Sequence, residues 1–143
     1  MYAALEHALS AGAAKAIVVG SDIPDVSATL LQAAAAALDQ HEVVLGPAHD
    51  GGFYLIGATR TAPAMLQGIT WSAATVREAT AAQLHTSGLS VAPEDALPAL
   101  LDIDTVQDMR TWVDVQERRP AREAQHPVLA AAEDALQCCK APA

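Results

Sequence analysis

A short apolar run that ends on a carboxylate constrains this chain more than any other feature. Residues 16–24 read AIVVGSDIP, so the run leads into Gly20, Ser21, Asp22 and Pro24. A continuous apolar run bounded by Gly and Pro predicts a buried strand. In open α/β sheets ligands bind at the rim where such strands end, so Asp22 is a candidate ligand for a divalent cation. The alternative is a plain turn, because Ser and Asp are common turn residues.

Further strands and helices are predicted to alternate along the chain. Ser27 is suited to cap one helix, Ser72 another that stops before Gly88, and Thr105 a third with Asp108 as its capping-box acid. The predicted helices cover residues 2–11, 28–39, 73–87 and 106–117, with a short helical turn at 94–101, and the strands 16–20, 43–46, 53–57 and 89–91. Such alternation is typical of an α/β sandwich with a mostly parallel sheet. Residues 1–118 therefore form the predicted domain, and 119–143 a tail with at most one helix, at 128–137.

Charge and composition exclude several classes of function. The chain has 143 residues with 17 acidic and 8 basic side chains, a net charge of −9. A nucleic-acid partner is not expected, because it requires a basic face. No apolar run is long enough for a membrane span and no signal peptide is recognisable, so we expect a cytoplasmic protein that does not bind membranes. The adjacent Cys138 and Cys139 suit neither a structural disulfide nor a zinc site.

A glycine-rich segment between two apolar runs is the second candidate site. Residues 46–57 read GPAHDGGFYLIG. Glycines allow a ligand to approach the backbone closely, and His49 or Asp50 is a candidate base. The alternative is a hairpin, since Asp-Gly between apolar runs is a strong turn signal. Both interpretations are compatible, because a turn can also be a binding loop.

Two further positions remain open between a functional and a structural role. In Asp102-x-Asp104-Thr105 a second carboxylate can complete a cation site begun by Asp22, or the acids can simply favour the start of a helix. Trp71 offers a face on which a base or a sugar can stack, but a lone Trp is more often a core residue.

The order and spacing of these motifs resemble one known family. GSDxP, VVLGPAxDGGFYLIG, WSxxxV and DxDT follow one another over roughly residues 1–115. They are similar to small GT-A-like nucleotide-diphospho-sugar transferases, a group that includes glycosyltransferases of the arsenosugar-biosynthesis type. The resemblance implies a Rossmann-like three-layer sandwich and glycosyl transfer from a nucleotide sugar, aided by Mg²⁺ or Mn²⁺. It implies these roles: Asp22 and Asp104 as metal ligands, Asp50 or His49 as base, and Ser21, Gly51, Gly52, Tyr54 and Trp71 as substrate contacts.

The same resemblance leaves two other functions open. A nucleotidyltransferase on this scaffold would attack the α-phosphate instead of the sugar carbon, and a truncated domain would serve as a non-catalytic binding or assembly module. Family members usually carry an N-terminal strand and nucleotide-binding loop ahead of the position of Met1. Without that strand, residues 17–19 would form an exposed sheet edge, a feature that proteins normally cover. We therefore expect a homodimer, paired through this edge or through the tail at 120–143.

Overall fold

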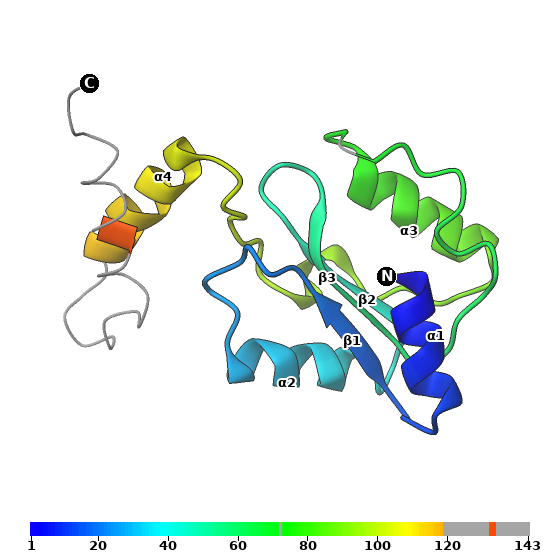
Figure 1. Cartoon of the computed structure of the whole chain (residues 1–143). Helices are drawn as coiled ribbons and strands as arrows, with labels where there is room; N and C mark the ends of the chain where they lie inside the picture. The colour runs from blue at the N-terminus through cyan, green and yellow to red at the C-terminus, as the bar shows by residue number, and fades with distance from the viewer. Residues whose placement is uncertain (72, 119–131, 134–143) are drawn as a thin grey trace.

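The computed structural model describes residues 1–71, 73–118 and 132–133 (Figure 1). Its elements follow in the order α1 (Tyr2–Ser10), β1 (Ala16–Val19), α2 (Ala28–Ala37), β2 (Val43–Pro47), β3 (Phe53–Ala58), α3 (Val76–Thr86), a 3₁₀ turn η1 (Glu94–Ala96) and α4 (Val106–Glu117). Each lies close to a predicted element, except that residues 89–91 form no strand. There Val91 makes only an isolated parallel bridge to Val43.

The prediction of a mostly parallel, Rossmann-like sandwich is wrong. The described strands form a three-stranded sheet of order β1-β3-β2, in which β3 is antiparallel to both neighbours. The register sets Ile56 opposite Val18 on one side and opposite Leu45 on the other. β1 and β2 do run in the same direction, as a strand–helix–strand unit does. The hairpin at residues 48–52, however, folds β3 back into the position between them.

Local side-chain hydrogen bonds explain where two of the helices begin. Ser27 Oγ accepts a hydrogen bond of 3.2 Å from the backbone N–H of Leu30 at the start of α2. At the start of α4, Thr105 Oγ1 accepts one of 3.2 Å from the N–H of Asp108, whose carboxylate accepts one from the N–H of Thr105. Both predicted caps are thus confirmed. α3 has Thr75 at its N-cap.

Three sequence-based predictions fall wholly or largely on parts of the chain that the structure does not describe. The expected cap Ser72, most of the helix expected at 128–137, and Cys138 and Cys139 all lie outside the described residues.

Helices cover both faces of the small sheet. On one face, Leu5 of α1 and Leu84 of α3 are buried against Leu45 and Ile56. On the other face, Leu30 and Ala34 of α2 are buried against Val44 and Leu55. This arrangement, visible in Figure 1, explains why every residue of β2 is buried. Within the described ranges, no helix has the length and apolar character needed to cross a bilayer.

Strand β1 lies at one edge of this sheet and pairs only with β3 among the described strands. The backbone N–H of Gly20 donates to the carbonyl of Tyr54 over 2.8 Å, so alternation along the strand turns the N–H groups of Ile17 and Val19 away from β3.

Pairing of this edge with a second copy remains a prediction. It rests on the apolar, half-buried side chains of β1, since an unpaired apolar edge strand favours pairing with another chain. A sedimentation series over micromolar concentrations should show a monomer–dimer equilibrium. A species that stays monomeric at every concentration would contradict it.

Candidate functional site

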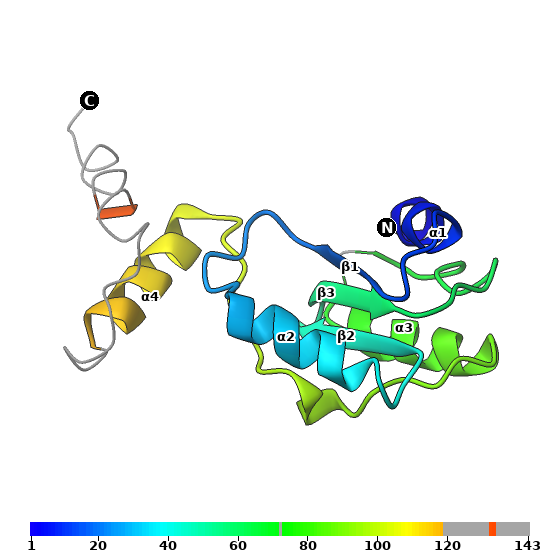
Figure 2. The same cartoon turned by 90° about the horizontal axis from the view of Figure 1, so that it is seen from below.

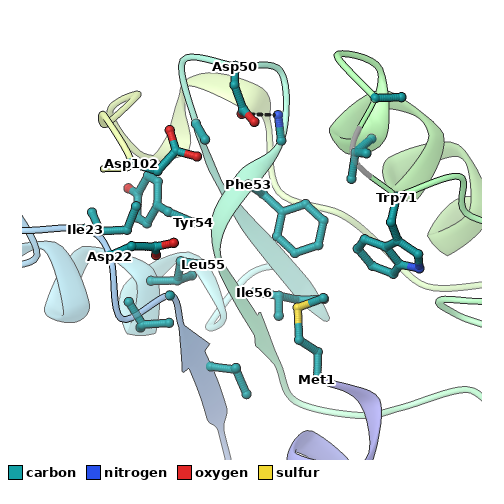
Figure 3. Close-up of a pocket in the computed structure, with 17 residues that line it drawn as sticks. Met1, Asp22, Ile23, Asp50, Phe53, Tyr54, Leu55, Ile56, Trp71 and Asp102 are labelled. Carbon is teal, nitrogen blue, oxygen red and sulfur yellow. Dashed lines mark hydrogen bonds between the residues drawn. The ribbon is translucent and has the colours of Figure 1, made fainter. Parts of the chain in front are cut away.

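A pocket of about 370 Å³ opens where β1 ends and the β2–β3 hairpin begins. Its walls come from the end of β1 and the residues after it (18–20, 22 and 23), the hairpin (48, 50 and 52–56), residues 71, 73 and 76, Met1 and Asp102 (Figure 3). Its volume lies in the range of small-molecule sites. Three carboxylates (Asp22, Asp50 and Asp102) line it, and the described lining residues include no Lys, Arg or His.

Asp22 and Asp102 occupy the same side of the pocket although 80 positions separate them in the chain (Figure 3). A backbone hydrogen bond of 3.0 Å from the N–H of Ile103 to the carbonyl of Asp22 joins their two segments. The absence of a side chain at Gly20 also matters here. A Cβ at Gly20 would come within 2.7 Å of Asp22 Oδ1, so the carboxylate rests directly over this glycine.

The carboxylates on the acidic side of the pocket are close enough to repel one another. Partial burial raises the pKa of Asp102 above its ordinary value, and the nearby carboxylates of Asp50, Asp104 and Asp22 raise this pKa further. Burial and like charges both disfavour the ionised form of a carboxyl group. A cation placed among these groups would relieve both effects.

Two hydrogen bonds hold the hairpin turn at the rim of the pocket, one within the turn and one to the start of α3. Asp50 Oδ1 accepts a hydrogen bond of 2.7 Å from the N–H of Gly52, and Gly51 adopts a φ of +90°. The carbonyl of Gly51 accepts a hydrogen bond of 3.1 Å from the N–H of Arg77 at the start of α3. The segment is therefore a hairpin, as the Asp-Gly signal indicates, and it forms part of the pocket wall. Its role as a binding loop remains a prediction.

Aromatic and apolar side chains form the opposite side of the pocket. The rings of Phe53 and Trp71 lie with centroids 6.3 Å apart at an interplanar angle of 59°. Trp71 is 46% exposed and Met1 49% exposed, which is unusual for such large apolar side chains. Trp71 is therefore a surface residue at the pocket mouth and not a core residue.

Tyr54 lines the base of the pocket but directs its hydroxyl elsewhere. The hydroxyl donates to the carbonyl of Pro98 over 3.0 Å, and burial raises the pKa of Tyr54 to about 12. Its ring is seated against Gly46, where a Cβ would come within 2.6 Å of the ring. Tyr54 thus shapes the wall through its ring.

The structure gathers part of the predicted site into this pocket. Asp22, Asp50, Gly52, Tyr54 and Trp71 line it. Other predicted residues, although described, lie outside its lining: Ser21, His49, Gly51 and Asp104.

The predicted site did not include Asp102, which lines the pocket, although the motif that contains it was recognised. The sequence signal that distinguishes the two acids is the N-cap Thr105. Asp104 directly precedes this N-cap and is exposed at the start of the helix. Ile103, between the two acids, packs against α4 and bonds to Asp22, so Asp102 is the acid at the pocket.

The residues present fit a divalent cation that takes its remaining ligands from water or from a phosphate. Within the described residues, no three His, Cys, Asp or Glu side chains are gathered closely enough to cage an ion by themselves. Mg²⁺, however, is usually held by one or two carboxylates together with substrate phosphates. Asp22 and Asp102 supply such a pair of hard oxygen donors.

Comparisons with known proteins show the family to which this chain belongs. The structure matches that of a "putative nucleotide-diphospho-sugar transferase" from Desulfovibrio desulfuricans G20, with a TM-score of 0.78 and 33% sequence identity. The match covers 95% of this chain but 58% of that protein, so this chain spans little more than half of its length. None of the curated proteins matches the sequence. Residues 1–73 match the family model of uncharacterized proteins conserved in bacteria, DUF2064. The chain therefore belongs to the DUF2064 family.

Proposed function

We propose that this chain is the core of a transferase that uses a nucleotide-diphosphate sugar and a divalent cation. The observation that carries the proposal is the convergence of Asp22 and Asp102 on one pocket, opposite the exposed ring of Trp71. The similarity to the Desulfovibrio protein supports the substrate class. The charge of the pocket supports a cation, because a diphosphate beside three carboxylates would otherwise be repelled.

The two sides of the pocket suit the two ends of such a ligand. Asp22 and Asp102 hold Mg²⁺ or Mn²⁺, which neutralises charge on the departing diphosphate when bound. Trp71 and Phe53 offer apolar faces to a base or a sugar ring. Of the two predicted bases, Asp50 lines the pocket, so we assign it the proton of the acceptor hydroxyl.

Calorimetry provides the direct test of this function. Mn²⁺ should bind the protein alone, and nucleotide sugars should bind only when Mn²⁺ is present, since the cation screens the diphosphate from the carboxylates. A matched titration with the sugar phosphate that lacks a nucleotide separates recognition of the base from recognition of the sugar. A folded protein that binds neither Mn²⁺ nor millimolar nucleotide sugar would contradict the proposal.

Analysis of products distinguishes the alternative on the same scaffold. Release of a nucleoside diphosphate indicates glycosyl transfer, whereas release of pyrophosphate from a nucleoside triphosphate indicates nucleotidyl transfer. Binding without either product indicates a non-catalytic binding module.

A further inference from the structure

Two side-chain hydrogen bonds join helix α4 to the segment that carries Asp22. Trp112 Nε1 donates a hydrogen bond of 2.8 Å to Asp25 Oδ2, and Gln116 Nε2 donates one of 3.1 Å to Asp25 Oδ1. Trp112 and Gln116 are four residues apart, so they lie on one face of the helix. Both oxygens of a single carboxylate are therefore held by this one helix face.

These contacts are partly buried and join distant parts of the chain. Trp112 is 1% exposed and Gln116 7% exposed, and 87 and 91 positions separate them from Asp25. Burying a polar side chain is favourable only when its hydrogen bonds are made. The two hydrogen bonds thus join α4, which lies beyond the end of the sheet (Figure 2), to the segment after β1.

The same helix also fixes the segment that carries Asp102. Only three residues separate Asp102 from the start of α4, and the reciprocal hydrogen bonds of Thr105 and Asp108 set the direction in which the chain enters the helix. Between them, Ile103 packs against Trp112 and Val113.

We infer that α4 is a brace that sets the spacing of Asp22 and Asp102, with Asp25, Trp112 and Gln116 as positioning residues for the cation site. The helix is hydrogen-bonded through Asp25 to the segment that carries Asp22, and the segment that carries Asp102 leads directly into the helix. This inference rests on the proposed function, because it assigns the two carboxylates to one cation.

The test measures Mn²⁺ affinity by calorimetry, well below the unfolding temperature, in variants that break the brace without touching the pocket. Trp112→Phe keeps an aromatic ring and removes the donor, and Gln116→Met keeps the length and removes the amide. Each is expected to weaken Mn²⁺ binding about tenfold, the scale on which residues that orient metal ligands act. Thr111→Ala is the matched control, since Thr111 Oγ1 bonds only within α4, to the carbonyl of Gln107.

A double-mutant cycle separates positioning from general destabilisation. If Trp112 acts through Asp25, the variant with both Trp112→Phe and Asp25→Ala should bind Mn²⁺ no more weakly than Asp25→Ala alone. A lower unfolding temperature with unchanged Mn²⁺ affinity in both Trp112→Phe and Gln116→Met would overturn the brace and leave the proposed function standing. Failure of the wild-type protein to bind Mn²⁺ would overturn both.

Discussion

Replacement of Asp22 or Asp102 by alanine is expected to abolish the stabilisation that Mn²⁺ gives to the protein. A ligand that binds only the folded state at about 100 times its dissociation constant adds about 2.7 kcal/mol to the free energy of unfolding. Both carboxylates line the pocket, and their segments are joined between Asp22 and Ile103, so loss of either leaves one ligand. The measurement is the change in unfolding temperature on adding Mn²⁺.

Asp104→Ala is the matched control for this experiment. Asp104 is exposed, lies outside the pocket lining and stands two positions from Asp102, so its removal takes away the same charge without taking away a ligand. It should keep most of the Mn²⁺-dependent shift. Should Asp104→Ala lose the shift while Asp102→Ala keeps it, the resemblance would have assigned the ligand correctly and the pocket geometry would not.

The Asp102→Ala variant is expected to fold. The pKa of Asp102 is raised by partial burial and by neighbouring carboxylates, so its ionised form is less favourable in the folded chain than in the unfolded chain. Above the folded-state pKa, removing this charge therefore relieves repulsion instead of breaking a favourable contact. A loss of Mn²⁺ binding in Asp102→Ala can then be attributed to the ligand and not to unfolding.

Local signals in the sequence predict the elements well, and they fail where the fold depends on pairing between distant segments. Ser27 and Thr105 mark helix starts because a cap involves only neighbouring residues. The order of strands in the sheet depends instead on pairing between segments that are distant in the sequence. Alternating strands and helices favour parallel pairing, whereas the turn at Asp50 and Gly51 reverses the chain and inserts β3 between β1 and β2. The hairpin signal was correct, but a local turn signal does not specify that β3 also pairs with β1.

The site shows the same division between local and distant information. Asp22 was predicted from its place after a strand, and the structure sets it in the pocket. The choice between Asp102 and Asp104 depends on the direction of the chain before α4. Ile103 sets this direction, because its backbone N–H donates to the carbonyl of Asp22, 81 positions earlier, and its side chain packs against α4. His49 shows the limit for loop residues: its backbone N–H bonds to Leu100, and it lies outside the lining of the pocket that its neighbour Asp50 helps to form.

Gly51→Ala is expected to be the most destabilising single-methyl change at the pocket. Gly51 has a φ of +90°, and a non-glycine residue in this region costs about 1–2 kcal/mol. A Cβ there would also come within 1.9 Å of the carbonyl oxygen of Ala74, a backbone atom that cannot rotate away. Overpacking of this kind adds about 1–3 kcal/mol, so the total loss in the free energy of unfolding should be about 2–5 kcal/mol. Denaturant unfolding monitored by circular dichroism measures it.

Gly12→Ala separates the backbone strain from the steric clash. Gly12 has a similar φ of +99°, but nothing lies within 4 Å of a Cβ built on it, so this variant should lose only the strain contribution. The difference between the two variants then measures how tightly the turn is held against the start of α3, where Arg77 also bonds to Gly51. Equal losses would mean that the turn can shift away from Ala74 at no cost. In that case Asp50 and Trp71, which stand on either side of this contact, would not be held in a fixed relation across the pocket.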